Sequence, residues 1–267
     1  MRKIIITALL FALLISYPIW QTYVSSKGPE LSVAVASNFL STLEALTKNF
    51  EKETGVKVRL SSGSSGKLTT QIIQGAPYDM FFSADVVHPK KLEESRLTIK
   101  GSRLTYAIGQ LVVWAPNNTY ATSVENLFTN GNYDFIAIAN PDLAPYGVAA
   151  QEFLQHLNLW GRLSNKIIKG ENINQTFQFV KSGNAQIGII AFSQVKQMNA
   201  DPQDNIHFFI VDTSLYNPIE QQVVLLSGSK KKALAKMFLS FIQEDNNRKL
   251  IENSGYITPH KRIIQVH

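Results

Sequence analysis

The chain has 267 residues, with 26 Lys and Arg against 20 Asp and Glu and no cysteine. The lack of cysteine excludes disulfides, thiolate catalysis, cysteine-bound metals and a lipid anchor on an N-terminal cysteine. The lysines are spread along the chain, and the densest cluster, residues 230–232, begins a helix whose other face is apolar. The net charge of +6 therefore indicates solubility and mild attraction of anions, and not a nucleic-acid-binding surface.

The first 26 residues are expected to direct export and not to be part of the fold. Two basic residues precede an apolar run over residues 4–15, as in a secretory signal peptide. This run is shorter than the roughly 20 apolar residues that cross a bilayer. The first interpretation is therefore a cleaved signal peptide and a periplasmic location. An uncleaved inner-membrane anchor stays open, because the cleavage site is poor and because Trp20 and Tyr23 lie where interfacial anchors occur in membrane segments.

The rest of the chain, about 240 residues, is long enough for one large or two small domains. It alternates between strand and helix signals. Strand-like runs occur at residues 31–36, 56–60, 79–82, 110–115, 135–138, 166–168, 186–190 and 221–226. Apolar residues at helical spacing occur at residues 40–50, 68–73, 86–94, 149–157 and 233–241. This alternation predicts an α/β fold with mostly parallel sheets flanked by helices.

Two of the strand-like runs, residues 110–115 and 221–226, are long enough to cross between two halves of a molecule. The segment between them contains its own set of strands and helices. This nested order predicts two lobes with a cleft between them. The first lobe is expected to comprise residues 27–112 and 223–267, and the second lobe residues 113–222.

A serine-rich turn follows the second strand. Residues 61–65 read Ser-Ser-Gly-Ser-Ser and lead directly into a helix. The start of a helix offers free backbone N–H groups at the positive end of the helix dipole, and here serine hydroxyls lie beside them. Such a turn can bind an anion without a cationic side chain. Taken alone, it is equally consistent with a flexible turn.

Three further helix starts repeat this arrangement. They are Ser37-Asn38 after the first strand, residues 140–147, and residues 170–174. Each of them alone is explained by helix capping. In open α/β sheets, however, ligands bind beyond the carboxyl ends of the strands, where helices begin. Four such starts, divided evenly between the two lobes, therefore predict one anion site in the cleft.

Several motifs taken together resemble the molybdate-binding periplasmic proteins of ABC transporters. They are VAVASNF at 33–39, SGSSG at 62–66, QGAPYDMFFSAD at 74–85, NP at 140–141 with APYG at 144–147, and GII at 188–190 with SQV at 193–195. The resemblance runs from about Leu31 to the C-terminus in one register. It implies a two-lobed periplasmic binding protein that closes on a tetrahedral oxyanion, with two crossover strands as the hinge.

The resemblance also implies a set of ligand-binding residues. By position, it places hydroxyl ligands at Ser37 and Ser65 in the first lobe and main-chain ligands at Tyr146 and Ile173 in the second. Many members of the family add a tyrosine hydroxyl just after the strand at 186–190, where this chain has Ala-Phe. Relatives with Asn after the first-strand Ser or Thr use that amide instead. Asn38 is therefore the expected substitute.

The function implied by the resemblance is binding, not catalysis. The chain is expected to capture molybdate, and tungstate as well, as a monomer without a cofactor, and to deliver it to an ABC permease. Two alternatives stay open. One is a binder of another tetrahedral oxyanion such as sulfate. The other is a membrane-anchored sensory module with the same fold, which an uncleaved anchor would support.

The residues themselves offer no competing catalytic or metal site. The five histidines lack metal-ligand spacing, and no serine lies in a Gly-x-Ser-x-Gly motif. Asp79 and Asp85 flank an apolar strand, and strand-end and helix-cap roles explain them better than an acid–base pair. Lys67 is close to the serine-rich turn, but as an early helical residue it is expected to point to solvent.

Overall fold

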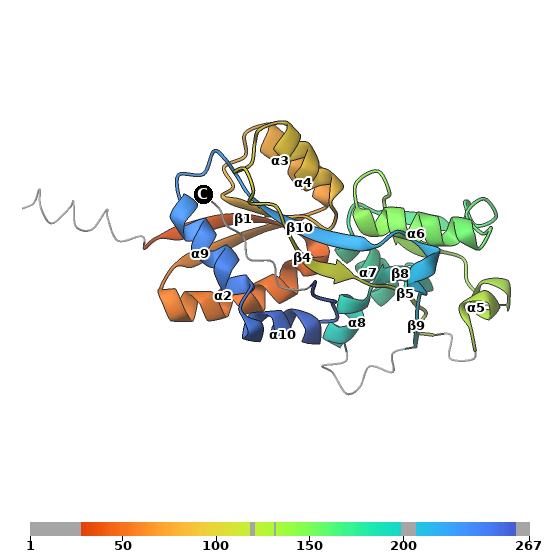
Figure 1. Ribbon diagram of the computed structural model, residues 1–267. Coiled ribbons are helices and arrows are strands. Elements are labelled where there is room, and N and C mark those ends of the chain that lie inside the picture. Colours follow the sequence, from red (N-terminus) through yellow and green to blue (C-terminus); the bar gives the residue numbers. More distant parts are fainter. Residues whose placement is uncertain (1–27, 118–120, 131, 199–206, 260–267) are drawn as a thin grey trace, which may run out of the picture.

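The computed structural model describes residues 28–117, 121–130, 132–198 and 207–259 (Figure 1). In this part of the chain the strands form two five-stranded sheets, one in each of two lobes that lie side by side. None of the helices described is long and apolar enough to span a membrane. The expected signal peptide or anchor, residues 1–26, lies outside the described residues.

The first sheet is mixed, with one reversed strand. Its order is β2-β1-β3-β10-β4. The strands are β1 (Glu30–Ala36), β2 (Lys57–Gly63), β3 (Met80–Phe82), β4 (Leu104–Gly109) and β10 (Ile219–Leu225). β1 is parallel to β2 and β3, whereas β10 runs antiparallel to β3 and β4.

The second sheet has the same arrangement. Its order is β7-β6-β8-β5-β9. The strands are β5 (Leu111–Trp114), β6 (Ile136–Ala139), β7 (Ile167–Gly170), β8 (Ile187–Ala191) and β9 (Phe208–Ile210). β6 is parallel to β7 and β8, and β5 runs antiparallel to β8 and β9. In each sheet, four of the five strands therefore end at the same edge.

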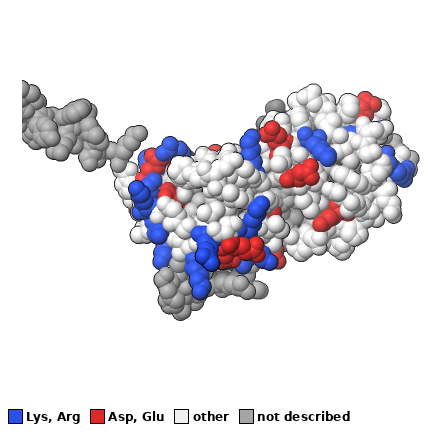
Figure 2. Space-filling model, turned by 90° about the horizontal axis from the view of Figure 1, so that it is seen from above, with Lys and Arg blue, Asp and Glu red and all other residues white. Residues whose placement is uncertain are grey.

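Helices cover both faces of each sheet. The first lobe contains η1 (Ser37–Phe39), α2 (Leu40–Thr54), α3 (Ser65–Ile73), α4 (Val87–Glu94), α9 (Lys232–Ile242) and α10 (Asp245–Asn253). The second lobe contains α5 (Val124–Asn130), α6 (Pro145–His156), α7 (Ile173–Lys181) and α8 (Phe192–Met198), and η2 (Thr213–Leu215) lies on the return path. Lys and Arg side chains are interspersed with Asp and Glu on the face seen in Figure 2.

The alternation of side chains along the strands produces the two helical layers of the first lobe. Val33 and Val35 on β1 belong to a cluster with apolar residues of α2, α9 and α10. Ala34, which lies between them, belongs to a cluster with residues of α3 and α4 on the opposite face. Successive residues of a strand point to opposite faces, so a strand covered on both sides is apolar throughout. Figure 1 shows the two helical layers on either side of the sheet.

β2 is longer than the sequence predicted. Residues 61–65 were expected to form a turn, but Ser61, Ser62 and Gly63 pair with the end of β1 in parallel register. Because β1 continues to Ala36, it offers a backbone partner to each of these residues. Only Ser64 remains between the strand and α3.

The chain passes between the two sheets twice. Gln110 separates β4 from β5, and residues 211–218 separate β9 from β10. β5 pairs over its whole length in the second sheet, and β10 pairs in the first. Judged by the strand pairing, the chain therefore passes from one sheet to the other a few residues before each of the two expected boundaries between the lobes. The division into lobes at 112/113 and 222/223 stays a prediction.

Gly147 allows α6 to lie close to the end of β6. A Cβ atom at this position would lie 2.3 Å from the carbonyl oxygen of Ala139 and 2.7 Å from the carbonyl carbon of Asn140. Both atoms belong to the backbone, so neither can move unless the end of the strand shifts. Because Gly147 has no side chain, the first turn of α6, which includes Tyr146, can pack directly against the end of β6.

We expect Gly147→Ala to destabilise the protein by roughly 1–3 kcal/mol, because the added methyl group overpacks a backbone contact. Urea unfolding followed by circular dichroism measures this loss. Gly161→Ala is the matched control, because a Cβ at Gly161 meets no atom within 4 Å. Equal stability of the two variants would contradict the close packing of α6 against β6.

Candidate functional site

A cavity at the carboxyl ends of the strands lies between the two lobes. The first lobe contributes residues that follow β1, β2 and β3, and the second lobe contributes the starts of α6 and α7. The lining residues are Ala36, Ser37, Asn38, Gly63, Ser64, Ser65, Ala84, Ala144, Pro145, Tyr146 and Ile173. The cavity volume is about 10 Å³, close to the space that one water molecule needs. Pockets for drug-sized ligands span roughly 300–1,000 Å³, so the lobes are closed too tightly around these donors for a ligand of that size.

All five residues that the sequence predicted as ligands line this cavity. Ser37, Asn38 and Ser65 lie on the first-lobe side, and Tyr146 and Ile173 lie on the second-lobe side. Each is less than a tenth exposed to solvent. The remaining lining residues were not predicted as ligands, although Gly63, Ser64, Ala144 and Pro145 belong to the predicted helix starts, and they are mainly small residues.

The two serine hydroxyls are available as donors. Ser65 Oγ accepts the backbone N–H of Ala84 at 3.0 Å, which leaves the hydroxyl proton free for the cavity. Ser65 is fully buried. The hydroxyl of Ser37 has no hydrogen-bond partner among the described residues. These two side chains follow β2 and β1, respectively, which are adjacent parallel strands.

The second lobe contributes backbone N–H groups at two helix starts. The side chain of Asn172 accepts the N–H groups of Asn174 and Gln175 at 3.0 and 3.1 Å. This cap leaves the N–H of Ile173, the first of α7, without a partner in the helix. Pro145 is the first residue of α6 and has no N–H, so Tyr146 carries the first N–H of that helix.

A buried glutamine fixes the start of α7. Gln194 Nε2 donates to the carbonyl oxygen of Ile173 at 3.1 Å, and its Oε1 accepts the N–H of Ala191 at 3.1 Å. The side chain therefore ties α7 to the end of β8. Sequence reasoning did not predict this role, because nothing in the chain indicates which residues a buried amide will contact.

The side chain of Asn38 differs from the expectation. Its Nδ2 donates to Gln221 Oε1 at 2.7 Å and to the Tyr256 hydroxyl at 3.2 Å. Both amide protons are therefore used within the first lobe, and neither replaces the tyrosine hydroxyl that is missing after β8. The group that Asn38 can still offer to the cavity is its backbone N–H in the first turn of η1.

Three buried tyrosines surround Asn38 and Gln221. Burial raises the pKa of Tyr106 and Tyr146 well above the ordinary tyrosine value. Burial also raises the pKa of Tyr256 to about 12, although the hydrogen bond from Asn38 Nδ2 opposes part of this rise. All three hydroxyls are consequently protonated at physiological pH. The Tyr256 hydroxyl donates to the carbonyl oxygen of Asn38 at 2.7 Å.

The two lobes touch around the cavity. The N–H of Gly66, in the first turn of α3, donates to the carbonyl oxygen of Leu143 in the second lobe at 3.0 Å. Lys67 Nζ lies 3.3 Å from Glu171 Oε2, and both side chains are more than half exposed. Lys67 therefore lies outside the cavity, and its exposed ion pair contributes little stability. These contacts describe a closed form, in which both lobes enclose the site.

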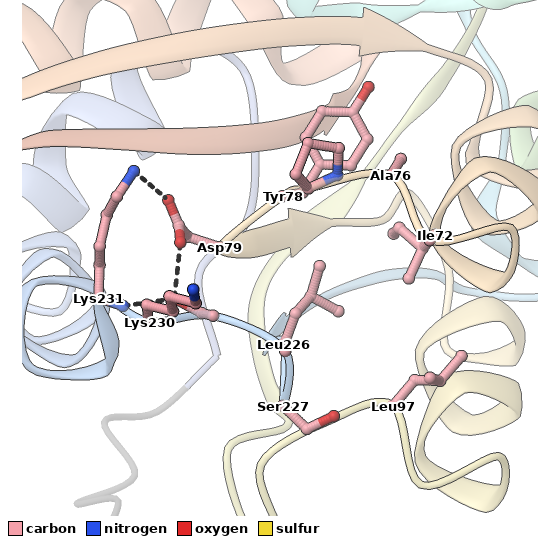
Figure 3. Close-up of a pocket in the computed structure, with 13 residues that line it drawn as sticks. Ile72, Ala76, Tyr78, Asp79, Leu97, Leu226, Ser227, Lys230 and Lys231 are labelled. Atoms are coloured by element: carbon pink, nitrogen blue, oxygen red, sulfur yellow. Dashed lines mark hydrogen bonds and ion pairs between the residues drawn. The ribbon is translucent and has the colours of Figure 1, made fainter.

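Neither Asp79 nor Asp85 lines the cavity. Asp79 accepts the N–H of Ser32 and the hydroxyl of Ser229, and Lys231 points toward it in Figure 3. The open hollow of about 410 Å³ beside Asp79 lies at the amino end of β3, away from the donors described above. Asp85 accepts the N–H of His88 at the start of α4. Strand-end and helix-cap roles are therefore confirmed for the two carboxylates.

The cavity has no charged lining group. Among its lining residues there is no Lys, Arg, His, Asp or Glu, and the Tyr146 hydroxyl is directed to Gln221. The described residues also include no group of three or more His, Cys, Asp or Glu suited to a metal ion. The site therefore offers neutral hydroxyl and N–H donors, which can surround a small anion.

Two sheet-containing lobes closed over a cavity of donors define a two-lobed solute-binding protein. The chain belongs to the family of bacterial extracellular solute-binding proteins, whose family model matches residues 31–257. Members of this family bind solutes and are not enzymes, as expected. The predicted fold class and the resemblance stated above are both confirmed by this match and by the relatives.

Its relatives include two molybdate-binding proteins named ModA. That of Rhodobacter capsulatus is 36% identical over 229 residues, which cover 86% of this chain and 88% of the relative. That of Azotobacter vinelandii is 35% identical over 232 residues, covering 87% and 91%. The solved structure of the periplasmic molybdate-binding protein of Azotobacter vinelandii superposes with a TM-score of 0.81 at 38% identity, covering 86% of this chain and all of that one.

Because Tyr256 is buried, the stability of the folded protein is expected to fall at alkaline pH. Its pKa is about 12 in the folded protein and near 10 in the unfolded chain, so its contribution is complete below pH 10 and is lost as the pH rises toward 12. We expect the free energy of unfolding to fall above pH 10. Each buried tyrosine adds up to about 1 kcal/mol per pH unit to that fall.

Tyr256→Phe tests this dependence. The variant should be less stable than the wild type at pH 7, because the carbonyl of Asn38 loses its donor. This deficit should shrink by about 1 kcal/mol between pH 10 and 11, because phenylalanine does not titrate. Urea unfolding at pH 7, 9, 10 and 11 measures it. A stability deficit that stays constant across this pH range would contradict the raised pKa of Tyr256.

Proposed function

We propose that this protein is the periplasmic solute-binding component of an ABC transporter that captures molybdate. The ligand would bind in the cavity between the lobes, and the closed protein would deliver it to a membrane permease. Tungstate would bind in the same way, because its size and charge are close to those of molybdate. The known ligand of the ModA relatives supports this proposal, since they cover most of the chain.

The observation that carries the proposal is the neutral donor set of the cavity. Molybdate is a dianion with no proton to donate, so every oxygen needs a donor from the protein. Hydroxyls and helix N-termini supply such donors and place partial positive charge at the ligand. A site without acceptor carboxylates matches a fully deprotonated oxyanion.

The proposed ligands come from both lobes. Ser37 and Ser65 would donate their hydroxyl protons, and Tyr146 and Ile173 would donate backbone N–H groups. Asn38 would contribute through its backbone N–H, because its amide protons are bound elsewhere. Neither lobe alone completes this shell, so the ligand stabilises the closed form relative to the open one.

The same donor set selects against other oxyanions. Hydrogenphosphate carries a proton that needs an acceptor, and the cavity lining contains no carboxylate. Sulfate has the charge of molybdate but shorter bonds, so it would leave some donors out of reach. An unmatched buried donor weakens binding more than the loss of contact alone, because it is also deprived of water.

Calorimetric titration of the protein from Lys27 onward with molybdate, tungstate, sulfate and phosphate tests the assignment. We expect molybdate and tungstate to bind tightly, and sulfate and phosphate to bind at least about 100-fold more weakly, which corresponds to about 2.7 kcal/mol. Sulfate binding equal to or tighter than molybdate binding would show that the protein is a sulfate binder with the same fold.

Ser65→Ala should weaken molybdate binding by roughly 10- to 150-fold, because one hydrogen bond to a charged ligand is lost. Ser62→Ala is the matched control, since Ser62 is an exposed residue of the same serine-rich stretch. Titration calorimetry of both variants measures the effect. An unchanged dissociation constant for Ser65→Ala would remove this hydroxyl from the ligand set.

A further inference from the structure

Gln221 lies at the centre of a buried hydrogen-bond network that joins the two lobes. It belongs to β10 and is 0% exposed. Its Oε1 accepts Asn38 Nδ2 at 2.7 Å and the Tyr106 hydroxyl at 3.0 Å. Its Nε2 donates to the Tyr146 hydroxyl at 3.3 Å. Asn38, Tyr106 and Gln221 belong to the lobe of the first sheet, and Tyr146 belongs to the lobe of the second sheet.

Gly109 provides the slot through which the Tyr146 hydroxyl reaches Gln221. A Cβ atom at Gly109 would lie 2.1 Å from that hydroxyl oxygen and 2.8 Å from Gln221 Nε2. Gly109 ends β4, directly before the chain passes into the second sheet. The Tyr146 side chain therefore inserts at the passage between the lobes, and the first turn of α6 that carries it lines the ligand cavity.

An irregularity in strand pairing directs a second side chain into the network. Gln221 pairs with Ala107, but the next residue, Gln222, pairs with Thr105, so Tyr106 is left without a partner on β10. Such a bulge redirects side chains and is common beside functional sites. Here it brings the Tyr106 hydroxyl to Gln221 Oε1 and within 3.1 Å of the carbonyl oxygen of Ser83 at the end of β3.

We propose that Gln221 is a positioning residue that latches the closed form by binding the Tyr146 hydroxyl and the Asn38 amide at the same time. This inference rests on the proposed oxyanion-binding function. Asn38 and Tyr146 are both lining residues of the ligand cavity, whereas Gln221 is not. The latch therefore holds a first-lobe donor segment and a second-lobe donor segment in register, without touching the ligand.

The latch acts on release of the ligand more than on its capture. Opening the lobes withdraws the Tyr146 hydroxyl from Gln221 and leaves a buried amide without one partner, which disfavours opening. The ligand enters the open form, in which this bond is not made. Loss of the latch should therefore increase the dissociation rate and leave the association rate unchanged.

Tyr146→Phe and Gln221→Leu test this latch. Tyr146→Phe removes only the hydroxyl and keeps the backbone N–H at the cavity. Each variant should raise the dissociation rate of molybdate roughly 3- to 10-fold, as expected for one buried hydrogen bond. The double variant should release molybdate no faster than the more affected single variant, because both remove the same bond. Stopped-flow fluorescence measures both rate constants.

Gln222→Leu is the matched control. Gln222 is the neighbouring residue on β10, and among the described residues its amide bonds only to Thr105 and Arg103 of the first lobe. It should leave the dissociation rate within twofold of the wild type. Circular dichroism confirms that each variant is folded, and Tyr146→Phe keeps the test decisive if Gln221→Leu does not fold.

The outcomes separate the latch from the proposed function. Wild-type dissociation rates in both latch variants, an equal increase in Gln222→Leu, additive effects in the double variant, or a slower association rate would each overturn the latch. If the wild type binds sulfate or phosphate in place of molybdate, the ligand assignment falls and the latch is measured with that ion. If none of the four oxyanions binds the wild type, the proposed function and the latch both fail.

Discussion

A small anion enclosed without a counter-charge can be held only by neutral donors that point at it from several directions. The parallel strands of each sheet meet this constraint, because they end at one edge and the helices that follow begin there. In the first lobe, β1 and β2 end side by side and are followed by Ser37 and Ser65. In the second lobe, α6 and α7 begin beside the ends of β6 and β7. The arrangement of the whole molecule brings these two edges face to face.

Close approach of the lobes depends on small residues at the junction. Ala36 and Ala84 of the first lobe pack in one apolar cluster with Tyr146 and Ile173 of the second. Gly66 lies within hydrogen-bond distance of Leu143 across the junction. A larger side chain at these positions would hold the lobes apart and enlarge the cavity. The size of the site is therefore set by the residues between its donors as much as by the donors themselves.

Asn38 shows how one residue can serve the site and the fold through different atoms. Its backbone belongs to the first helical turn, η1, while its amide donates to Gln221 and Tyr256. Tyr146 also uses different atoms for the two roles, because its backbone N–H is the first of α6 and its hydroxyl accepts a hydrogen bond from Gln221. The conformation of the donor segments is consequently coupled to the buried network behind them. This coupling gives the contacts between the lobes a direct effect on the geometry of the site.

The sequence determined the α/β class, most of the strands and the helix starts that surround the cavity, because these follow from local patterns, whereas the five predicted ligand residues came from the family resemblance. It did not indicate β4 and β9 or the extension of β2, since a strand of mixed character, a short edge strand and a serine-rich stretch become strands only when a partner is present. The side-chain partners of Asn38 were also decided by the tertiary structure alone. Gln221 and Tyr256 are distant from it in the chain, and a short polar side chain binds whichever partners the fold brings within reach. Local sequence thus specifies which backbone groups are free, whereas only the packing of the two lobes specifies where each side chain points.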